Sequence, residues 1–176
     1  KIFDFDFKDD VRLVMAQNFI QDWDLATDSE NLHAAFGICI LSPEWLAEIK
    51  QESQPDPIKI FKDCINEFEK NFNRLDIKWS EVNFLERGKK SLPVQGGPDV
   101  LRAIYSPRSD NGILNAVAGD GLYIYVNWDK LGEQRTLSIH QFGSSSTVEN
   151  SPHYDDQMDL FVGEKLKKTF FNKKTH

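Results

Sequence analysis

The sequence is poor in cysteine. Of its 176 residues only Cys39 and Cys64 are cysteines, and they lack the CxxC spacing that zinc ribbons and thioredoxin-like enzymes use, so both classes are excluded. Each cysteine lies on an apolar stripe with helical spacing, so buried thiols are the expected state. A disulfide between the two stays open if the protein works in an oxidising compartment.

Basic charge is also scarce. The chain has 21 lysines and arginines against 28 aspartates and glutamates, a net charge of −7, whereas phosphate binding needs a basic face. Nucleic acid is therefore excluded as the expected partner. The one basic cluster comes at the end of the chain and is interpreted as a solvated tail: Lys165, Lys167, Lys168, Lys173 and Lys174.

Long apolar runs are missing as well. No run approaches the roughly eighteen residues that a membrane-spanning helix needs, so no membrane segment is expected. The phosphate-binding patterns GxGxxG and GxxxxGK are absent too, and Pro98 removes an amide from the one Gly-Gly pair. The chain begins at Lys1 without Met or signal peptide, which predicts a processed or excised piece whose targeting segment, if any, lies upstream.

What is present indicates one folded domain over residues 1–176. Hydrophobic residues make up 40% of the chain and include 13 phenylalanines, enough for a sizeable core. The first half has four apolar stripes at helical spacing. They are Val11, Val14, Met15 and Phe19; Leu32, Ala35, Phe36, Cys39 and Ile40; Trp45, Leu46 and Ile49; and Phe61, Cys64, Ile65, Phe68 and Phe72.

Three local signals predict where these helices begin. Thr27 and Glu30 have capping-box spacing ahead of the second stripe. Ser42-Pro43 is typical of an N-cap and first turn, and predicts that a separate helix carries the third stripe. Asp56-Pro57 gives the same signal for the fourth stripe.

The second half favours strands. SLPVQGGPDVL (91–101) is predicted to be a loop that turns at its glycines. After it, 122–127 and 136–140 alternate apolar and polar residues, which indicates two antiparallel strands with one polar face and a hairpin link. The expected fold class is α+β, with helices to about residue 86 and antiparallel strands from about 100 to 142.

The segment FGSSSTVENSPHYDDQ (142–157) is the most unusual stretch and allows several chemistries. A metal could use His153, Asp155 and Asp156 with His140, but adjacent residues on a turn seldom converge on one ion. A nucleophilic set could be drawn from Ser144–Ser146, His153 and Asp155, although the GxSxG elbow is absent.

A structural role for this segment is favoured over both. Pro152 fixes its own backbone and biases Ser151 towards an extended conformation. His153 is expected to bond backbone carbonyls or Asp155, and Tyr154 to bury its ring. Asp155 or Asp156 is expected to cap a last short helix. The turn would then pin that helix and residues 165–171 to the sheet.

The same segment resembles the closing motif of the penicillin acylase (penicillin amidase) family of N-terminal-nucleophile hydrolases. Ser151-Pro152-His153-Tyr154-Asp155-Asp156-Gln157 after a Gly/Ser-rich turn is its most specific part. NFIQDWDLATDSENLHAAFG, LPVQGGPDVL, AGDGLYIYVNWD and LSIHQFGSSS are similar to family segments in the same order, over residues 18–171. Gly143-Ser144-Ser145 stands where the family often has Gly-Gln-Ser, and acyl-homoserine-lactone and aculeacin-type acylases are the most similar subgroup.

The resemblance implies an αββα fold and cleavage of a linear amide by a serine at the amino terminus of a β-chain. That serine, the oxyanion-hole residues and the calcium ligands lie upstream in the family. No catalytic, cofactor-binding or metal residue is therefore assigned here, and the chain by itself is expected to be inactive. The implied partners are the other acylase segments and a small amide substrate, and the implied location is periplasmic or secreted. A binding module of the same architecture, without chemistry, is the alternative.

Overall fold

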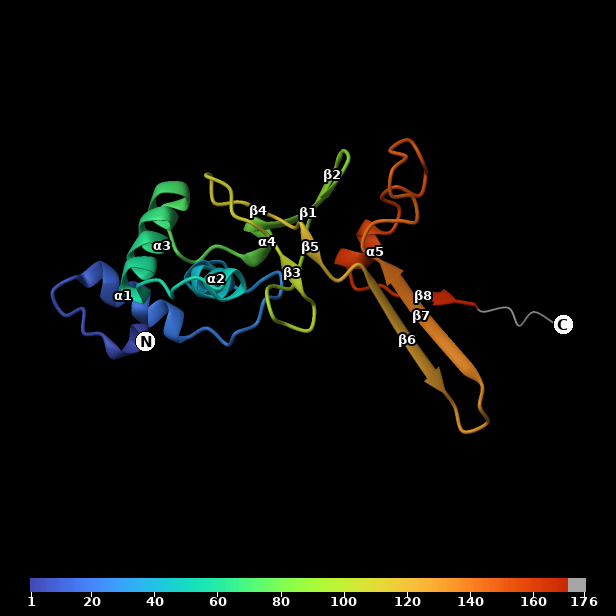
Figure 1. Ribbon diagram of the computed structural model, residues 1–176, viewed down its shortest axis with the longest axis horizontal. Coiled ribbons are helices and arrows are strands. Elements are labelled where there is room, and N and C mark those ends of the chain that lie inside the picture. Colours follow the sequence, from blue (N-terminus) through green and yellow to red (C-terminus); the bar gives the residue numbers. More distant parts are fainter. Residues whose placement is uncertain (171–176) are drawn as a thin grey trace.

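The computed structural model describes residues 1–170 and has helices in its first half and strand pairs in its second (Figure 1). The α+β class is confirmed. The helices are a 3-10 turn at Ile2–Asp4, then α1 (Val11–Gln21), α2 (Ala34–Lys50), α3 (Pro57–Phe72), α4 (Trp79–Val82) and α5 (Met158–Val162). The strands are β1 (Asn83–Arg87), β2 (Lys90–Pro93), β3 (Ile104–Tyr105), β4 (Leu114–Asn115), β5 (Ala118–Gly119), β6 (Leu122–Trp128), β7 (Gln134–His140) and β8 (Lys167–Thr169).

α1 begins where expected but buries a different face. The Asp10 side chain accepts hydrogen bonds from the amides of Arg12 and Leu13, which fixes the start of the helix. Leu13, Ala16 and Ile20 are buried, while Val11 and Met15 are 70% and 66% exposed. Of the predicted stripe, Phe19 packs against the helical core, whereas Val11 and Met15 do not. Apolar residues occur all round this helix, so spacing alone does not select one face.

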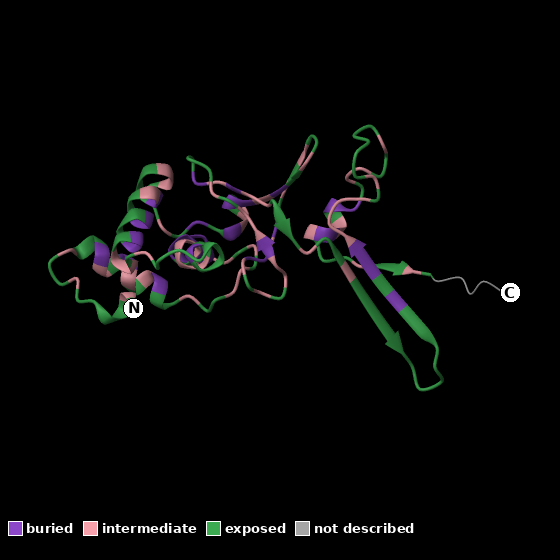
Figure 2. Cartoon of the chain, in the orientation of Figure 1, coloured by how far each residue is buried: buried purple, intermediate pink, exposed green. Residues whose placement is uncertain are grey.

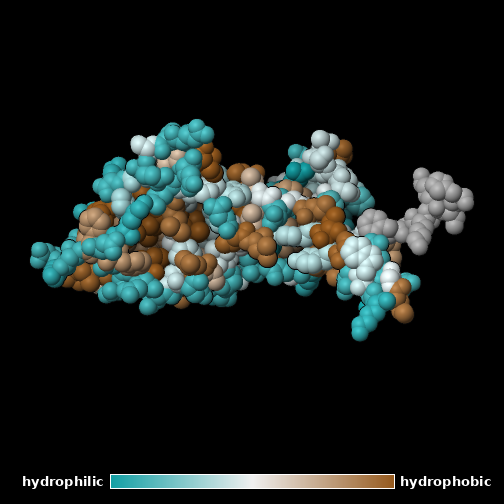
Figure 3. Space-filling view, turned by 60° about the horizontal axis from the view of Figure 1, so that its bottom comes forward, coloured by the Kyte–Doolittle hydropathy of each residue, from teal (hydrophilic) through white to brown (hydrophobic). Residues whose placement is uncertain are grey.

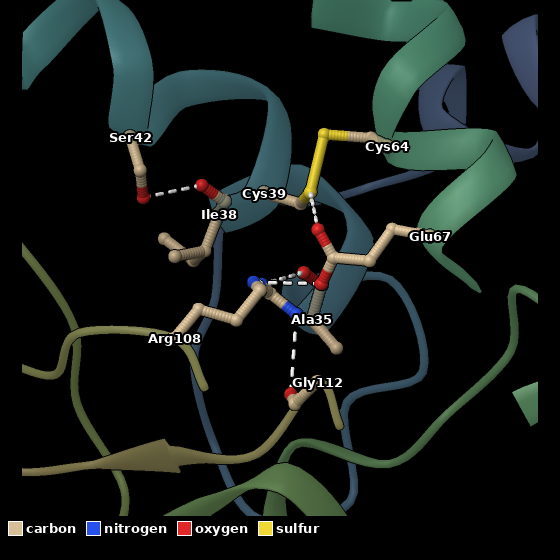
Figure 4. Close-up of a disulfide and its surroundings, with 8 residues drawn as sticks. All are labelled: Ala35, Ile38, Cys39, Ser42, Cys64, Glu67, Arg108 and Gly112. Carbon is tan, nitrogen blue, oxygen red and sulfur yellow. Dashed lines mark hydrogen bonds and ion pairs between the residues drawn. A yellow bond between two sulfur atoms is a disulfide. The ribbon is translucent and has the colours of Figure 1, made fainter. Parts of the chain in front are cut away.

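α2 contradicts two of the predicted boundaries. Asn31, not Thr27, holds its first turn, because Asn31 Oδ1 accepts from the amides of His33 and Ala34 at 3.0 and 2.9 Å. Leu32, expected in the core, is 41% exposed. No helix begins at Ser42-Pro43, because α2 continues through Pro43. Ser42 Oγ donates to the Ile38 carbonyl at 2.6 Å (Figure 4). The hydroxyl therefore bonds to the preceding turn of the same helix and does not cap a new one.

α3 agrees with the sequence signal. Asp56 accepts from the Ile58 amide at 2.9 Å, Pro57 takes the first helical position, and the helix ends at Asn73 in the left-handed conformation. Cys39 of α2 and Cys64 of α3 form a disulfide, with their Cα atoms 6.0 Å apart. The expectation of two free thiols is therefore wrong. A bridge that closes a loop of this size stabilises a fold by about 3 kcal/mol in chain-entropy terms.

The strands begin earlier than expected and are not all antiparallel. β1 and β2 form a hairpin that turns at Gly88, whose φ is +59°. Ser91–Pro93 therefore belongs to a strand, and the predicted loop begins only after it. β1 also pairs with β4 in parallel over two residues, giving the order β2-β1-β4. Charged residues in 83–93 hid the strand pattern of this hairpin.

The long hairpin of β6 and β7 is antiparallel, as predicted, and β8 pairs with the other side of β7. Its single polar face is not confirmed. The register places Ile124 opposite Ser138 and Tyr123 opposite Ile139, so apolar side chains occur on both faces. β8 places part of the predicted basic tail in the sheet; Phe171, Lys173 and Lys174 lie outside the described residues.

Two hydrophobic cores lie along the molecule (Figure 2). The helical core packs α1, α2, α3 and α4 around Phe36, Phe61 and Phe68, all fully buried. The strand core comprises Leu85, Val94, Ile104, Ile139, Met158 and Phe161. The predicted turn at the glycines joins the two halves. The Gly96 amide donates to the Thr27 carbonyl, and its own carbonyl accepts from Trp79 Nε1 at 2.8 Å.

Candidate functional site

Residues 142–157 form a closed loop between β7 and α5, which we call the closing turn (Figure 1). The Gln157 amide donates to the Phe142 carbonyl at 2.7 Å, and the Ser145 amide donates to the His153 carbonyl at 3.0 Å. A side chain on Gly143 would overlap that same carbonyl of His153, so this position requires glycine. The two arms of the turn are thus held against each other by backbone hydrogen bonds.

Arg87 of β1 holds the closing turn from outside. Its guanidinium group lies 4.2 Å from the centre of the Tyr154 ring and 4.8 Å from that of Phe142. Arg87 Nη2 also donates to the carbonyls of Ser146 and Ser145, at 2.7 and 3.4 Å. Arg87 was not singled out in the sequence. It is 58 residues from Ser145, and an arginine near a strand end carries no local signal of such a role.

The histidine of the turn is a surface residue. The His153 side chain is 63% exposed and its Nδ1 pairs with Asp156 Oδ2 at 3.0 Å, so the expected partners, Asp155 and backbone carbonyls, were wrong. Neither aspartate caps α5 through its side chain. Buried Gln157 precedes the helix instead, and its Oε1 accepts from the His140 amide at 3.2 Å.

A second tie joins the end of the turn to β2. Lys90 Nζ donates to Asp159 Oδ2 at 2.6 Å and lies 3.5 Å from the Asp155 carbonyl. The hydrogen bond from Lys90 lowers the pKa of Asp159, and the same bond raises the pKa of Lys90. The last helix is therefore held in place, but by Lys90 of β2 through Asp159 and not by the turn as predicted; Arg87 contacts only the turn.

The closing turn does not assemble the nucleophilic set drawn from it. Ser145 Oγ donates to the Val148 carbonyl, and Ser151 Oγ accepts from the backbone amide of His153. Within residues 1–170 no serine or threonine hydroxyl is hydrogen-bonded to a histidine ring, the contact that activates such a nucleophile. In the same residues no three His, Cys, Asp or Glu side chains are placed to hold one metal ion, His140 and His153 included. The hydrogen bonds described for the turn join parts of its own backbone to each other and to β1, and its role as a structural lock stays a prediction.

An apolar groove lies beside the disulfide. Its volume is about 790 Å³, and it lies between α2, the first turns of α3 and residues 104–108. Trp45 and Tyr105 stack at its edge with ring centres 5.0 Å apart. Hydrophobic residues also gather on the helical half in the space-filling view (Figure 3). Such a groove suits an apolar ligand or polypeptide segment.

The polar end of the groove is an ion pair (Figure 4). Arg108 Nε lies 3.3 Å from Glu67 Oε1, and the guanidinium group also donates to the carbonyls of Ala35 and Gly112 at 3.3 Å each. Burial lowers the pKa of Arg108, and the nearby Glu67 carboxylate opposes that shift. The carboxylate lies next to the disulfide, with Oε2 3.9 Å from Cys39 Sγ. These contacts tie the 108–112 loop to both helices.

Comparison with known proteins decides the family. The family model described as penicillin amidase matches residues 7–176, which includes both cores and the closing turn. The chain belongs to the penicillin amidase family. The resemblance seen in the Ser-Pro-His-Tyr motif is therefore confirmed over nearly the whole chain.

The chain is also similar to one named protein. The chain is similar to the acyl-homoserine lactone acylase PvdQ of Pseudomonas fluorescens, with 31% identity over 90 residues. These residues are 49% of this chain and 11% of the relative, so the chain spans a small part of that protein's length. Membership of the penicillin amidase family also accounts for the mixed α+β fold.

No helix within residues 1–170 is long and apolar enough to cross a membrane.

Proposed function

We propose that this chain is the carboxyl-terminal portion of an acylase that cleaves a linear amide, and that the complete protein acts on N-acyl homoserine lactones. The family match over residues 7–176 carries the proposal. The substrate class is supported by the similarity to an acyl-homoserine lactone acylase. An apolar acyl group also agrees with the apolar pockets that the family resemblance implies.

The reaction follows an acyl-enzyme route. A serine at a newly formed amino terminus, outside this chain, attacks the amide carbonyl, and its own α-amino group takes the hydroxyl proton. Preorganised donors stabilise the oxyanion, the amine leaves with that proton, and water then hydrolyses the ester to release the acid. The residues of this chain maintain the fold around that centre, with Arg87 and Lys90 fixing the closing turn.

The setting of the protein is part of the proposal. We place it in the periplasm or outside the cell, because the Cys39–Cys64 disulfide suits an oxidising compartment. A structural calcium ion, where the complete enzyme has one, would be bound by other segments. The partners are those remaining segments and the small amide substrate.

The test compares the complete polypeptide with the isolated 176 residues. Each is incubated with an N-acyl homoserine lactone and with penicillin G, and released acid and amine are measured by mass spectrometry. The complete protein should release fatty acid and homoserine lactone, while the isolated chain releases nothing from either substrate. Turnover by the isolated chain that survives repurification, or a complete protein that hydrolyses neither amide, would overturn the proposal.

The apolar groove favours a second candidate, a binding module without chemistry. This candidate predicts that the complete polypeptide binds an acyl-homoserine lactone reversibly and never releases fatty acid. Calorimetry and the hydrolysis assay on one preparation separate the two candidates, since binding without product favours the module.

A further inference from the structure

Strand β6 is an edge strand with an unpaired side. It bonds to β7 along Leu122–Trp128, and within residues 1–170 no strand pairs with its other edge. The hairpin projects from the body of the molecule (Figure 1), and β6 is exposed along most of its length (Figure 2). The backbone of this strand is therefore open to another strand.

The side chains of β6 do not suit an exposed edge. Its sequence LYIYVNW contains no charged residue and no proline, the usual protection of edges against further pairing. Ile124 is 53% exposed on one face and Tyr125 is 58% exposed on the other. A nearly continuous apolar strand is typical of one that is covered on both faces.

The hydrogen-bond register shows which backbone groups are open. The Gln141 amide donates to the Gly121 carbonyl, and the Asp129 amide donates to the Glu133 carbonyl. These directly opposed pairs fix the alternation of the antiparallel ladder, so the odd-numbered residues of β6 face β7. The amides and carbonyls of the even-numbered residues face the free edge: Leu122, Ile124, Val126 and Trp128.

We propose that β6 is an internal strand of the complete protein, and that a strand from another part of the same acylase polypeptide pairs with its free edge. The proposal rests on the proposed function only in that the chain belongs to a longer acylase. The aligned residues make up 11% of the relative, so a protein of that length has ample chain to supply the strand and cover both faces.

A second copy of this chain fits the edge less well. Pairing β6 with β6 would satisfy the backbone groups but leave the faces of the hairpin exposed. Each copy also has a net charge of −7, which opposes association. The proposal therefore commits to a strand of the same polypeptide.

Residue-resolved hydrogen exchange tests the proposal directly. In the complete polypeptide, the amides of Leu122, Ile124, Val126 and Trp128 should exchange at least about tenfold more slowly than in the 176-residue chain. The amides of Tyr123, Tyr125 and Asn127, bonded to β7, should be protected in both. Outward amides that exchange as freely in the complete polypeptide as an unpaired edge would overturn the proposal. So would concentration-dependent protection in the 176-residue chain, because it would identify a second copy.

A pair of proline variants gives an independent test. Ile124→Pro removes an outward amide, so the 176-residue chain should tolerate it, whereas the complete polypeptide should lose thermal stability. Tyr125→Pro removes a bond to β7 and should destabilise both. Equal tolerance of Ile124→Pro in the two proteins would count against the added strand. If the isolated chain does not fold, hydrogen exchange in the complete polypeptide decides alone. Outward amides protected as well as the inward amides support the added strand, and outward amides that exchange much faster contradict it. Hydrolysis is measured separately, so protected amides without turnover contradict the proposed function and leave this inference standing.

Discussion

At the scale of single residues, Arg87 contributes more to the closing turn than the histidine in its motif. The flat guanidinium group lies over the rings of both Tyr154 and Phe142 while it donates to two carbonyls of the turn. Lysine keeps the charge but has neither the flat face nor the fork of donors. The stability of the turn should therefore depend on arginine itself.

We predict that Arg87→Lys lowers the free energy of unfolding by about 1–3 kcal/mol, because the stacking and one of the two carbonyl hydrogen bonds are lost. Urea denaturation followed by far-UV circular dichroism measures the change. His153→Ala is the matched control within the same turn. Because the His153 side chain is exposed, this substitution should change the free energy of unfolding by about 0.5 kcal/mol or less. The reverse order of the two effects would contradict the lock described here.

At the scale of elements, the Lys90–Asp159 ion pair joins β2 to α5. The pKa of Asp159 is lowered in the folded chain, so its contribution to stability is present above the unfolded pKa and is lost as the pH falls through the folded value. The pKa of Lys90 is raised, so its contribution holds below its ordinary pKa and is lost as the pH rises through the raised value. Between these limits the pair is intact.

We predict that Asp159→Asn costs at most about 1 kcal/mol near neutral pH, since the carboxylate is 65% exposed. The difference from wild type should shrink as the pH is lowered from about 6 towards 2, and also in about 1 M salt. Urea midpoints across that pH series provide the measurement. A difference that stays constant with pH would show that Asp159 acts through something other than its charge.

At the scale of the whole molecule, the two cores meet at Asn83. This residue is fully buried between Val82 of the helical core and Leu85 of the strand core. Its side-chain amide donates to the Val94 carbonyl at 2.9 Å, and its oxygen accepts from Ser106 Oγ at 2.8 Å. One side chain thus joins β1 to the segments on either side of the Gly-Gly loop.

We predict that Asn83→Ala costs about 2–3 kcal/mol and loosens both halves together, because it removes one buried and one partly buried hydrogen bond at their junction. Hydrogen exchange at Phe68 and Ile139 should accelerate in parallel. Asn115→Ala in neighbouring β4 is the control, because its buried Oδ1 has no hydrogen-bond partner among residues 1–170 to lose. Acceleration confined to one half would show that the cores are independent.

The sequence by itself determined the features that depend on neighbouring residues. Asp56-Pro57 gave the start of α3, and the alternation in 122–140 gave the β6–β7 hairpin. Capping and alternation act over a few residues, so their signals are local. The Ser-Pro-His-Tyr motif likewise indicated the family, because it is a contiguous run.

Only the tertiary structure decided which distant groups meet. It continued α2 through Pro43, paired Cys39 with Cys64, and placed Arg87 against a turn 58 residues away while His153 stayed at the surface. Each outcome depends on packing between segments far apart in the chain, which no local pattern records. Local sequence patterns thus specified individual helices and strands, and packing between them determined which distant residues are in contact.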